Sequence, residues 1–345
     1  MTGIELYKRE EKSWMLDPRD HFSRKCVTFE IRTDFLTGHV SRVLPFRWRL
    51  TESKIDLSML EASRENCPFC PDQLSSVTPK FIPEVVPEGR LTRGRATLFP
   101  NSFPYAQYSG VVALCEEHFL YPDQFTMETL RDGFGVAQEG IERVRKQAPE
   151  YEYSSINWNY LPQAGGGLFH PHLQIVVDKE PTVSQRRVLE GLRRYQSQGN
   201  RCFWEDCLAM EIEAGDRYAG REGDVHFVSA FSPHGVLGEI LIVFRKRSDL
   251  REFTSRDWEE FSQGMTRIFQ FFRVKHIDSF NLSLFSGGRG ETDTRVFGRL
   301  CPRAVMPPWN TSDVNYFEKL HDEVICVVSP EELNRELRTY FAETR

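Results

Sequence analysis

The chain has 345 residues, more than one ordinary hydrophobic core organises, and this length indicates about two domains. Hydrophobic residues make up 40% and charged residues 27%, which is the balance of a globular protein and excludes a disordered one. The formal net charge of −6 argues against a dedicated nucleic-acid-binding protein. No apolar run approaches the roughly 20 residues that span a bilayer, and residues 1–15 are too charged for a signal peptide. We therefore expect a cytoplasmic protein whose partners are neither membranes nor nucleic acids.

Two of the eight cysteines form a Cys-x-x-Cys motif, Cys67-Pro-Phe-Cys70. Such a pair supplies two zinc ligands, and His118 with one remote histidine would complete a Cys₂His₂ tetrahedron. A redox pair and a simple pair of buried thiols stay open as alternatives. The flanking Pro68 and Pro71, and the lack of a thioredoxin-like strand and helix around the motif, favour a rigid metal-binding knuckle.

Two stretches of the chain show the same order of expected elements: strand, strand, helix, strand, strand. The first covers residues 96–103, 110–115, 126–146, 155–160 and 170–177, and the second covers residues 225–231, 239–244, 255–274, 279–285 and 295–301. Both expected helices open at a capping residue, Thr126 in the first stretch and Ser255 in the second. The pattern predicts an α+β fold built from a diverged repeat with two antiparallel sheets, one in each copy with its packed helix.

The boundary between the two halves is expected after residue 183. The basic, polar stretch at residues 184–200 indicates a surface helix that joins the halves, and residues 330–345 have the pattern of a short amphipathic helix. We therefore expect an N-terminal half at residues 1–183, which holds the cysteine motif and the paired histidines, and a C-terminal half at residues 184–345.

The most informative stretch is the strand pattern His170-Pro-His-Leu-Gln-Ile-Val-Val177, which follows three glycines. Alternate residues of a strand share a face, so His170, His172 and Gln174 would converge on one surface. The glycines from Gly165 to Gly167 would let the backbone approach a ligand closely. A structural role for hydrogen-bonded histidines is the alternative, but two histidines at this spacing, followed by a glutamine, favour a catalytic site.

Five separated motifs lie between about residues 30 and 178. They are Arg32-x-Asp34-x-Leu36-Thr-Gly38, Cys67-Pro-Phe-Cys70-Pro, Pro100-Asn-Ser-Phe-Pro104, Glu117-His118 and His170-Pro-His-Leu-Gln174. In this order they resemble the galactose-1-phosphate uridylyltransferase family, the transferase branch of the histidine-triad superfamily. The resemblance implies a fold of two histidine-triad-like repeats, the second degenerate. It also implies a homodimer, because members of that family donate an N-terminal arm to the partner subunit.

The resemblance further implies roles for individual residues. His172 matches the nucleophile that becomes nucleotidylated, and Gln174 matches the residue that hydrogen-bonds the transferring phosphoryl group. Asn101 and Asn159 match asparagines that line the nucleotide site. The remaining candidates are the structural zinc ligands Cys67, Cys70, His118 and His170, and the substrate-binding residues Arg32, Gly165 and Gly167.

The chain departs from the family pattern at three places. Gly167 replaces a serine whose hydroxyl is expected to contact the acceptor phosphate. The second copy reads Arg295–Cys301 where a His-x-His pair would lie, and Phe285 stands where some relatives have a metal-ligating histidine. The hexose-contacting tail of the family survives only as Ser312–Glu318. The residues for nucleotidyl transfer are thus retained, while those for sugar recognition differ.

These features predict a nucleotidyltransferase that works by double displacement. His172 would attack the α-phosphorus of a nucleotide-sugar and pass the nucleoside monophosphate to a sugar 1-phosphate; no strong general acid is needed because the leaving phosphates are stable anions. Two alternatives stay open. One is a phosphorylase of the same superfamily, which takes a nucleotide-sugar or a dinucleoside polyphosphate and uses inorganic phosphate as acceptor. The other is a non-catalytic, zinc-stabilised nucleotide-binding protein.

Overall fold

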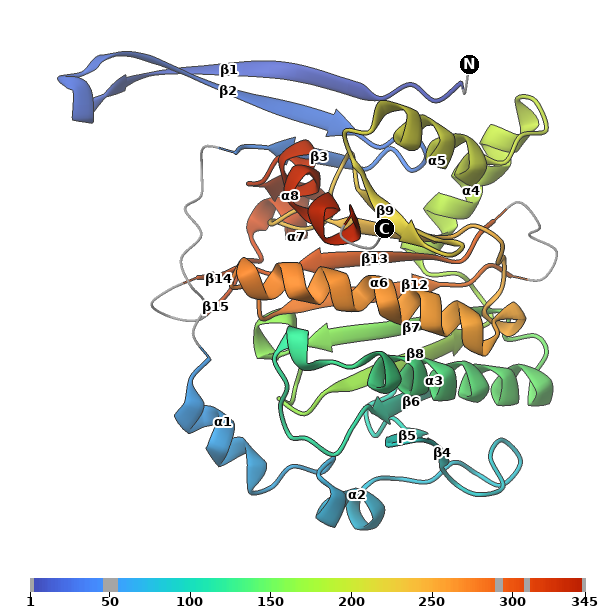
Figure 1. Ribbon diagram of the computed structural model, residues 1–345. Helices are drawn as coiled ribbons and strands as arrows, with labels where there is room; N and C mark the ends of the chain where they lie inside the picture. Colours follow the sequence, from blue (N-terminus) through green and yellow to red (C-terminus); the bar gives the residue numbers. More distant parts are fainter. Residues whose placement is uncertain (1–2, 46–54, 289–293, 307–310, 343–345) are drawn as a thin grey trace.

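The computed structural model describes residues 3–45, 55–288, 294–306 and 311–342 (Figure 1). Most strands form one antiparallel sheet of ten strands in the order β4-β5-β6-β8-β7-β12-β13-β11-β10-β9. Its strands are β4 (Leu91–Arg93), β5 (Ala96–Pro100), β6 (Tyr108–Ala113), β7 (Tyr153–Tyr160), β8 (His172–Asp178), β9 (Tyr218–Glu222), β10 (Val225–Ser229), β11 (Ile240–Phe244), β12 (Phe280–Phe285) and β13 (Phe297–Pro302).

The α+β class expected from the sequence is confirmed, but the two expected sheets are one. Strands β7 and β12 pair antiparallel at the centre, with Asn159 opposite Asn281. This pairing satisfies backbone groups that two separate sheets would leave as open edges. Counted outward from the junction, the strands of the first copy run β7-β8-β6-β5-β4 and those of the second run β12-β13-β11-β10-β9. The domain boundary after residue 183 stays a prediction.

Two long helices, α3 (Met127–Gln147) and α6 (Ser255–Val274), lie side by side on one face of the sheet (Figure 1). The N-cap of α3 is Thr126, as expected, and its side chain accepts a hydrogen bond from the backbone of Thr129. The N-cap of α6 is Thr254 rather than Ser255, because Thr254 forms a reciprocal capping box with Asp257.

One hydrophobic core joins these two helices to the strands of both halves of the sheet. Phe134 of α3 lies 4.8 Å from Phe261 of α6, measured between ring centroids, and Trp158 of β7 lies 5.0 Å from Phe280 of β12. All four rings are essentially inaccessible to solvent. The two halves therefore share a core across the β7–β12 junction, and neither half buries its apolar face alone.

A second layer, made of two helices, covers the opposite face of the sheet over its second half. The helix expected at residues 184–200 is α4 (Val183–Ser197), and α5 (Phe203–Ala214) follows it. Neither is a simple surface helix: side chains of both helices form a separate hydrophobic cluster with residues of β10, β11 and β13. The sequence did not predict α5. On the first half of this face, Phe69 and Leu74 pack against β5 and β6, and a cavity opens beside them.

Segments from the N-terminal and C-terminal parts of the chain pair in a smaller sheet of order β1-β2-β3-β16. Strands β1 (Tyr7–Asp17) and β2 (Ser23–Thr33) form a long hairpin, and β3 (Val40–Val43) pairs in parallel with β16 (Glu323–Cys326). The remaining elements are α1 (Leu57–Arg64), α2 (Pro71–Val77), β14 (Val305–Met306), β15 (Thr311–Ser312), α7 (Tyr316–His321), α8 (Pro330–Ala342) and the short 3₁₀ helices Pro18–Asp20, Pro122–Gln124, Pro162–Ala164 and Leu250–Glu252.

The expected C-terminal helix is α8; residues 343–345 of that prediction lie outside the described residues. Among the helices that the structure describes, none is both long enough and apolar enough to cross a membrane.

Candidate active site and metal centre

The paired histidines lie where β8 begins, in the interior of the sheet. Leu173, Ile175 and Val177 of β8 point into the core under the helices. His172 and Gln174 alternate with them and therefore face the opposite side, where α4 and α5 do not reach. His172 is only 7% exposed. The strand thus presents an imidazole and a carboxamide on one polar face, as the sequence predicted.

A hydrogen bond fixes the tautomer of His172. Its Nδ1 lies 2.7 Å from the backbone oxygen of His170. A carbonyl oxygen only accepts hydrogen bonds, so Nδ1 carries the proton and Nε2 keeps its lone pair. Burial lowers the pKa of His172, which keeps the ring neutral near pH 7. The arrangement is that of an imidazole prepared to act as a nucleophile through Nε2.

A cavity of about 450 Å³ opens over this face. Phe69, Phe99 and Val111 form its apolar wall. Six of the predicted site residues line it: Asn101, Asn159, Gly165, Gly167, His172 and Gln174. Residues from three of the five motifs therefore meet at one place, together with Asn159 and the glycine turn.

The glycine turn contributes open backbone to this cavity. A Cβ atom added at Gly165 or Gly167 would meet nothing within 4 Å, whereas one at Gly166 would lie 2.8 Å from the backbone oxygen of Asn159. Gly165 has a φ of +84°, a conformation that favours glycine. The turn can therefore approach a ligand on the side of Gly165 and Gly167, while Gly166 packs against β7.

Arg32 lies elsewhere. Its side chain is 3% exposed, and its guanidinium donates two hydrogen bonds of 2.8 Å to the carboxylate of Glu331 on α8. It also forms an ion pair with Glu30. A buried cation needs such partners, and they hold Arg32 between the hairpin and α8. Within the described chain, the structure does not bring Arg32 to the cavity.

The four predicted metal ligands converge near the start of β8. Their donor atoms all lie within 4.8 Å of one another, and all four residues are buried. The Sγ of Cys70 is 3.5 Å from Nδ1 of His118 and 3.8 Å from Nδ1 of His170, and the Sγ of Cys67 is 3.6 Å from the same His170 atom. Tetrahedral zinc with Zn–S bonds of about 2.3 Å and Zn–N bonds of about 2.0 Å requires sulfur–nitrogen distances of about 3.6 Å. The donor set therefore fits zinc in kind and in spacing.

Both ligand histidines are held in the tautomer that a metal needs. His170 donates from Nε2 to the backbone oxygen of Cys115 at 2.9 Å. His118 places Nε2 2.8 Å from the hydroxyl of Ser63, whose own proton goes to the backbone oxygen of Leu60. That hydroxyl must therefore accept from His118. In each ring Nδ1 keeps its lone pair and faces the cysteines.

The cysteine motif also contacts His172. The ring of Phe69, inside the motif, lies edge-on to His172 at 5.4 Å and to His170 at 6.0 Å between centroids. Burial raises the pKa of the Cys70 thiol to about 11, and the neighbouring Cys67 adds to this. A bound cation would displace that proton. The contacts of Phe69 and Ser63 with histidines of the site were not predicted from the sequence. Phe69 lies inside a recognised motif, whereas no sequence pattern marks Ser63.

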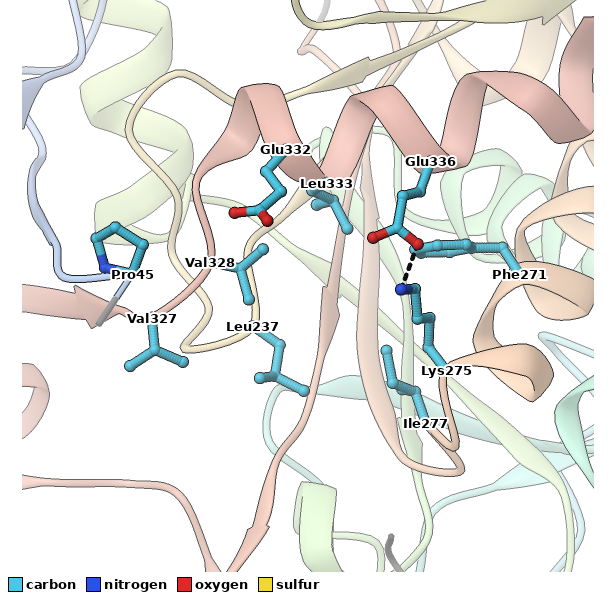
Figure 2. A pocket seen from close by; sticks show the side chains of 10 residues that line it. All are labelled: Pro45, Leu237, Phe271, Lys275, Ile277, Val327, Val328, Glu332, Leu333 and Glu336. Carbon is cyan, nitrogen blue, oxygen red and sulfur yellow. Dashed lines mark ion pairs between the residues drawn. The ribbon is translucent and has the colours of Figure 1, made fainter. Parts of the chain in front are cut away.

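A second cavity, of about 270 Å³, lies between α6 and α8 (Figure 2). Its walls are largely apolar, with Leu237, Phe271 and Ile277 among them, and an ion pair joins Lys275 to Glu336 at its rim (Figure 2). None of its described lining residues is a histidine or a cysteine. Of these two cavities, the β8 cavity is the one whose described lining contains a histidine.

Comparison with known proteins supports the fold. No family model matches the chain. An uncharacterised protein of Archaeoglobus fulgidus is 29% identical over 319 residues, which cover 91% of this chain and 93% of that protein. Among solved structures, an ADP-glucose phosphorylase from Arabidopsis thaliana with bound ADP-glucose is similar with a TM-score of 0.67 at 17% identity, over 89% of this chain and 98% of that chain. A uridylyltransferase structure is similar with a TM-score of 0.65 at 17% identity, over 91% and 99% of the two chains. The chain therefore has the fold of the galactose-1-phosphate uridylyltransferase type, as its motifs implied.

Proposed function

We propose that this protein is a nucleotidyltransferase that uses His172 as a covalent nucleophile. The observation that carries the proposal is the fixed tautomer of His172 in a cavity shared with Gln174 and Asn159. The donor is a nucleotide-sugar, and the acceptor is a sugar 1-phosphate. In line with the sequence features, the proposal includes a cytoplasmic homodimer.

The reaction proceeds in two displacements at the α-phosphorus. In the first, Nε2 of His172 forms a bond to phosphorus while the bond to the leaving sugar phosphate breaks, and the leaving oxygen keeps the electron pair. In the second, an oxygen of the acceptor phosphate forms the new bond while the nitrogen–phosphorus bond breaks. The proton on Nδ1 stays on its hydrogen bond to His170 throughout. Two inversions give net retention at phosphorus.

Side-chain amides of the cavity can stabilise the charge on the transferring group. Gln174 and Asn159 line the same cavity as His172, and each has an NH₂ group that can donate to a non-bridging phosphoryl oxygen. The apolar wall of Phe69, Phe99 and Val111 offers a surface for the nucleobase. The open side of the glycine turn leaves room for the phosphates.

Zinc held by Cys67, Cys70, His118 and His170 would serve as a structural cross-link. It would hold the start of β8 and the cysteine motif against each other. The backbone oxygen that orients His172 belongs to His170, so this cross-link also fixes the nucleophile.

A phosphorylase is the second candidate. The similar Arabidopsis protein is an ADP-glucose phosphorylase, and Gly167 lacks the hydroxyl expected to contact an acceptor phosphate in the transferases. With inorganic phosphate as acceptor, the products would be a nucleoside diphosphate and a sugar phosphate.

The experiment uses nucleoside diphosphate glucoses labelled at the α-phosphorus. Without acceptor, the wild-type protein should form an acid-labile labelled adduct, and His172→Gly should form none. His321→Asn is the matched control because His321 is exposed and far along the chain, on α7. Adding a hexose 1-phosphate or inorganic phosphate to the adduct then separates the two candidates by their products. A folded wild-type protein that forms no adduct with any nucleotide of the panel would refute the proposal.

A further inference from the structure

One side chain of the second half, that of Asn281, contacts two parts of the candidate active site. At the β7–β12 junction Asn281 lies opposite Asn159, and its Nδ2 donates to the Oδ1 of Asn159 at 2.8 Å. The same NH₂ group donates to the backbone oxygen of Ala164, also at 2.8 Å. Ala164 directly precedes the glycine turn of the cavity. Asn281 thus binds both the amide of Asn159 and the start of that turn.

The chemistry of its neighbours determines which way Asn281 is turned. The carbonyl of Ala164 only accepts, so the Asn281 atom that faces it is the NH₂ group. On the other side, Nη1 of Arg303 only donates, and it lies 3.2 Å from the Asn281 oxygen. Both ends require the same orientation.

The orientation of Asn159 follows from that of Asn281. Because Asn281 presents an NH₂ group, the Asn159 atom that accepts from it must be Oδ1. The NH₂ group of Asn159 is therefore turned away from β12. Asn159 lines the cavity beside His172, and among the described residues no hydrogen bond from this NH₂ group is found. It is a donor available to a ligand.

Arg303 is itself held in place. It forms an ion pair with Asp313 and donates to the hydroxyl of Ser312 at 3.1 Å. Asp313 is buried and also accepts from the backbone of Ala304 at 2.8 Å. The side chain that orients Asn281 is therefore anchored by two further groups of the second half.

We propose that Asn281, backed by Arg303, is a positioning residue for nucleotidyl transfer: it turns the NH₂ group of Asn159 toward the α-phosphoryl group that His172 attacks. This inference rests on the proposed function. It gives the second half, which lacks the nucleophile, a part in the reaction. It also predicts that Asn281 acts on the rate of transfer through its bond to Asn159 rather than through its bond to Ala164.

The test is a double-mutant cycle read by single-turnover adduct formation from a labelled nucleotide-sugar. Asn159→Leu removes the donor, and we expect a loss of about a hundredfold in rate, as for other single donors to transition-state charge. Asn281→Leu keeps the volume but frees the Asn159 amide to rotate, and we expect a loss of about tenfold. The double variant should be no slower than Asn159→Leu alone. Asn281→Ala repeats the measurement should the leucine variant fail to fold.

The matched control is Ser283→Ala. Ser283 lies two residues along β12 and makes the same kind of cross-strand bond, 2.8 Å from its hydroxyl to the oxygen of Asn157. Asn157 does not line the cavity, so the control should transfer the nucleotide at the wild-type rate. A folded Asn281 variant within threefold of wild type, or losses that multiply in the double variant, would overturn the inference. Absence of any adduct in the wild-type protein would instead refute the proposed function.

Discussion

The two halves of the sheet carry equivalent strands but put them to different use. Gln174 of β8 lies opposite Asn157 of β7, and Arg299 of β13 lies opposite Ser283 of β12. Two residues before each lie His172 in the first half and Phe297 in the second. His172 and Gln174 face a cavity, whereas Phe297 stacks on Trp204 of α5 at 5.1 Å between ring centroids. Whether such a strand forms a site or a core depends on what covers its face.

Arg299, the residue of the second half that is equivalent to Gln174, has a structural role as well. Arg299 pairs with Glu239, which also accepts a hydrogen bond from His234 at 2.9 Å. Burial would raise the pKa of Glu239, but its partners Arg299 and His234 hold that pKa well below its usual range. His39, next to the Leu36-Thr-Gly38 motif, stacks on His234 at 3.7 Å between ring centroids. The motif itself also packs against the second half, because Leu36 lies in the hydrophobic cluster of α4 and α5.

Removing the side chain at each of the two equivalent positions, His172 and Phe297, should give the largest effects. His172→Gly should abolish the covalent adduct and leave the fold, because the ring faces a cavity. Phe297→Ala removes a ring that is 4% exposed and should cost about 3–5 kcal/mol of unfolding free energy, with normal adduct formation by the folded fraction. Urea unfolding and adduct labelling measure the two quantities. Loss of chemistry in Phe297→Ala under conditions where it is fully folded would contradict this division of roles.

Sequence patterns predicted those parts of the fold where one face is buried. The inner strands of the central sheet alternate or run apolar, and α3 and α6 have clear caps, so these elements were predicted; the edge strands β4 and β9 were not. The hairpin of β1 and β2 was missed because it is exposed on both faces and carries charges instead of an apolar period. The junction of β7 with β12 was missed because strand pairing across halves leaves no local signal.

The residues of the candidate site likewise fall into those that the sequence predicted and those that it did not. The histidine and cysteine motifs predicted the candidate nucleophile and the four clustered candidate metal ligands, because nucleophilic catalysis and metal binding require those residue types. Arg32 was expected near the substrate, but the fold holds it against Glu331. Ser63 and Asn281 were not foreseen, since a serine or an asparagine gains its role only from the geometry of its neighbours.

The four potential metal ligands lie in the first half of the chain, and the role of the hydroxyl that contacts one of them can be tested. Ser63→Ala removes the acceptor that holds His118 in its metal-binding tautomer and should weaken zinc binding by about 10–100-fold. Ser76→Ala is the matched control, because Ser76 makes the same hydroxyl bond to the carbonyl three residues earlier but is exposed on α2. Competition with a chromogenic chelator gives both dissociation constants. Equal affinities of the two variants would disprove a role for Ser63.

The stabilisation that comes from the ion pair between Arg32 of the hairpin and Glu331 of α8 should depend on pH. Burial raises the pKa of Glu331, but hydrogen bonds and charge from Arg32 outweigh it and lower the pKa to about 2, from an ordinary 4.5. A carboxylate with a lowered folded-state pKa stabilises the fold above its ordinary pKa, and this contribution is lost as the pH falls toward 2. Glu331→Gln should therefore be less stable than wild type by about 1–2 kcal/mol at pH 7, since the partly exposed carboxylate makes charged hydrogen bonds and Arg32 keeps Glu30 as a partner.

The difference should shrink between pH 4.5 and pH 2, the interval over which the wild-type carboxylate loses its advantage. Urea unfolding at several pH values follows it. Glu332→Gln is the control, because Glu332 is the exposed neighbour of Glu331 on the same helix. A Glu331→Gln deficit that stayed constant down to pH 2 would show that the ion pair with Arg32 is not its cause.

The smallest effect on stability is expected inside the cavity, at the glycine turn. A Cβ at Gly167 meets nothing within 4 Å, so Gly167→Ser should change the unfolding free energy by no more than about 0.5 kcal/mol. Gly166→Ala is the contrasting variant, because its Cβ would lie 2.8 Å from the oxygen of Asn159 and 2.9 Å from that of Leu161. The added serine restores the hydroxyl that the family resemblance places near the acceptor phosphate. It should therefore lower the KM for a hexose 1-phosphate relative to inorganic phosphate while leaving the rate of adduct formation unchanged, which steady-state kinetics with each acceptor would measure. If the serine variant instead slowed formation of the adduct, the hydroxyl would act on the donor, and Gly167 would belong to the nucleotide side of the cavity.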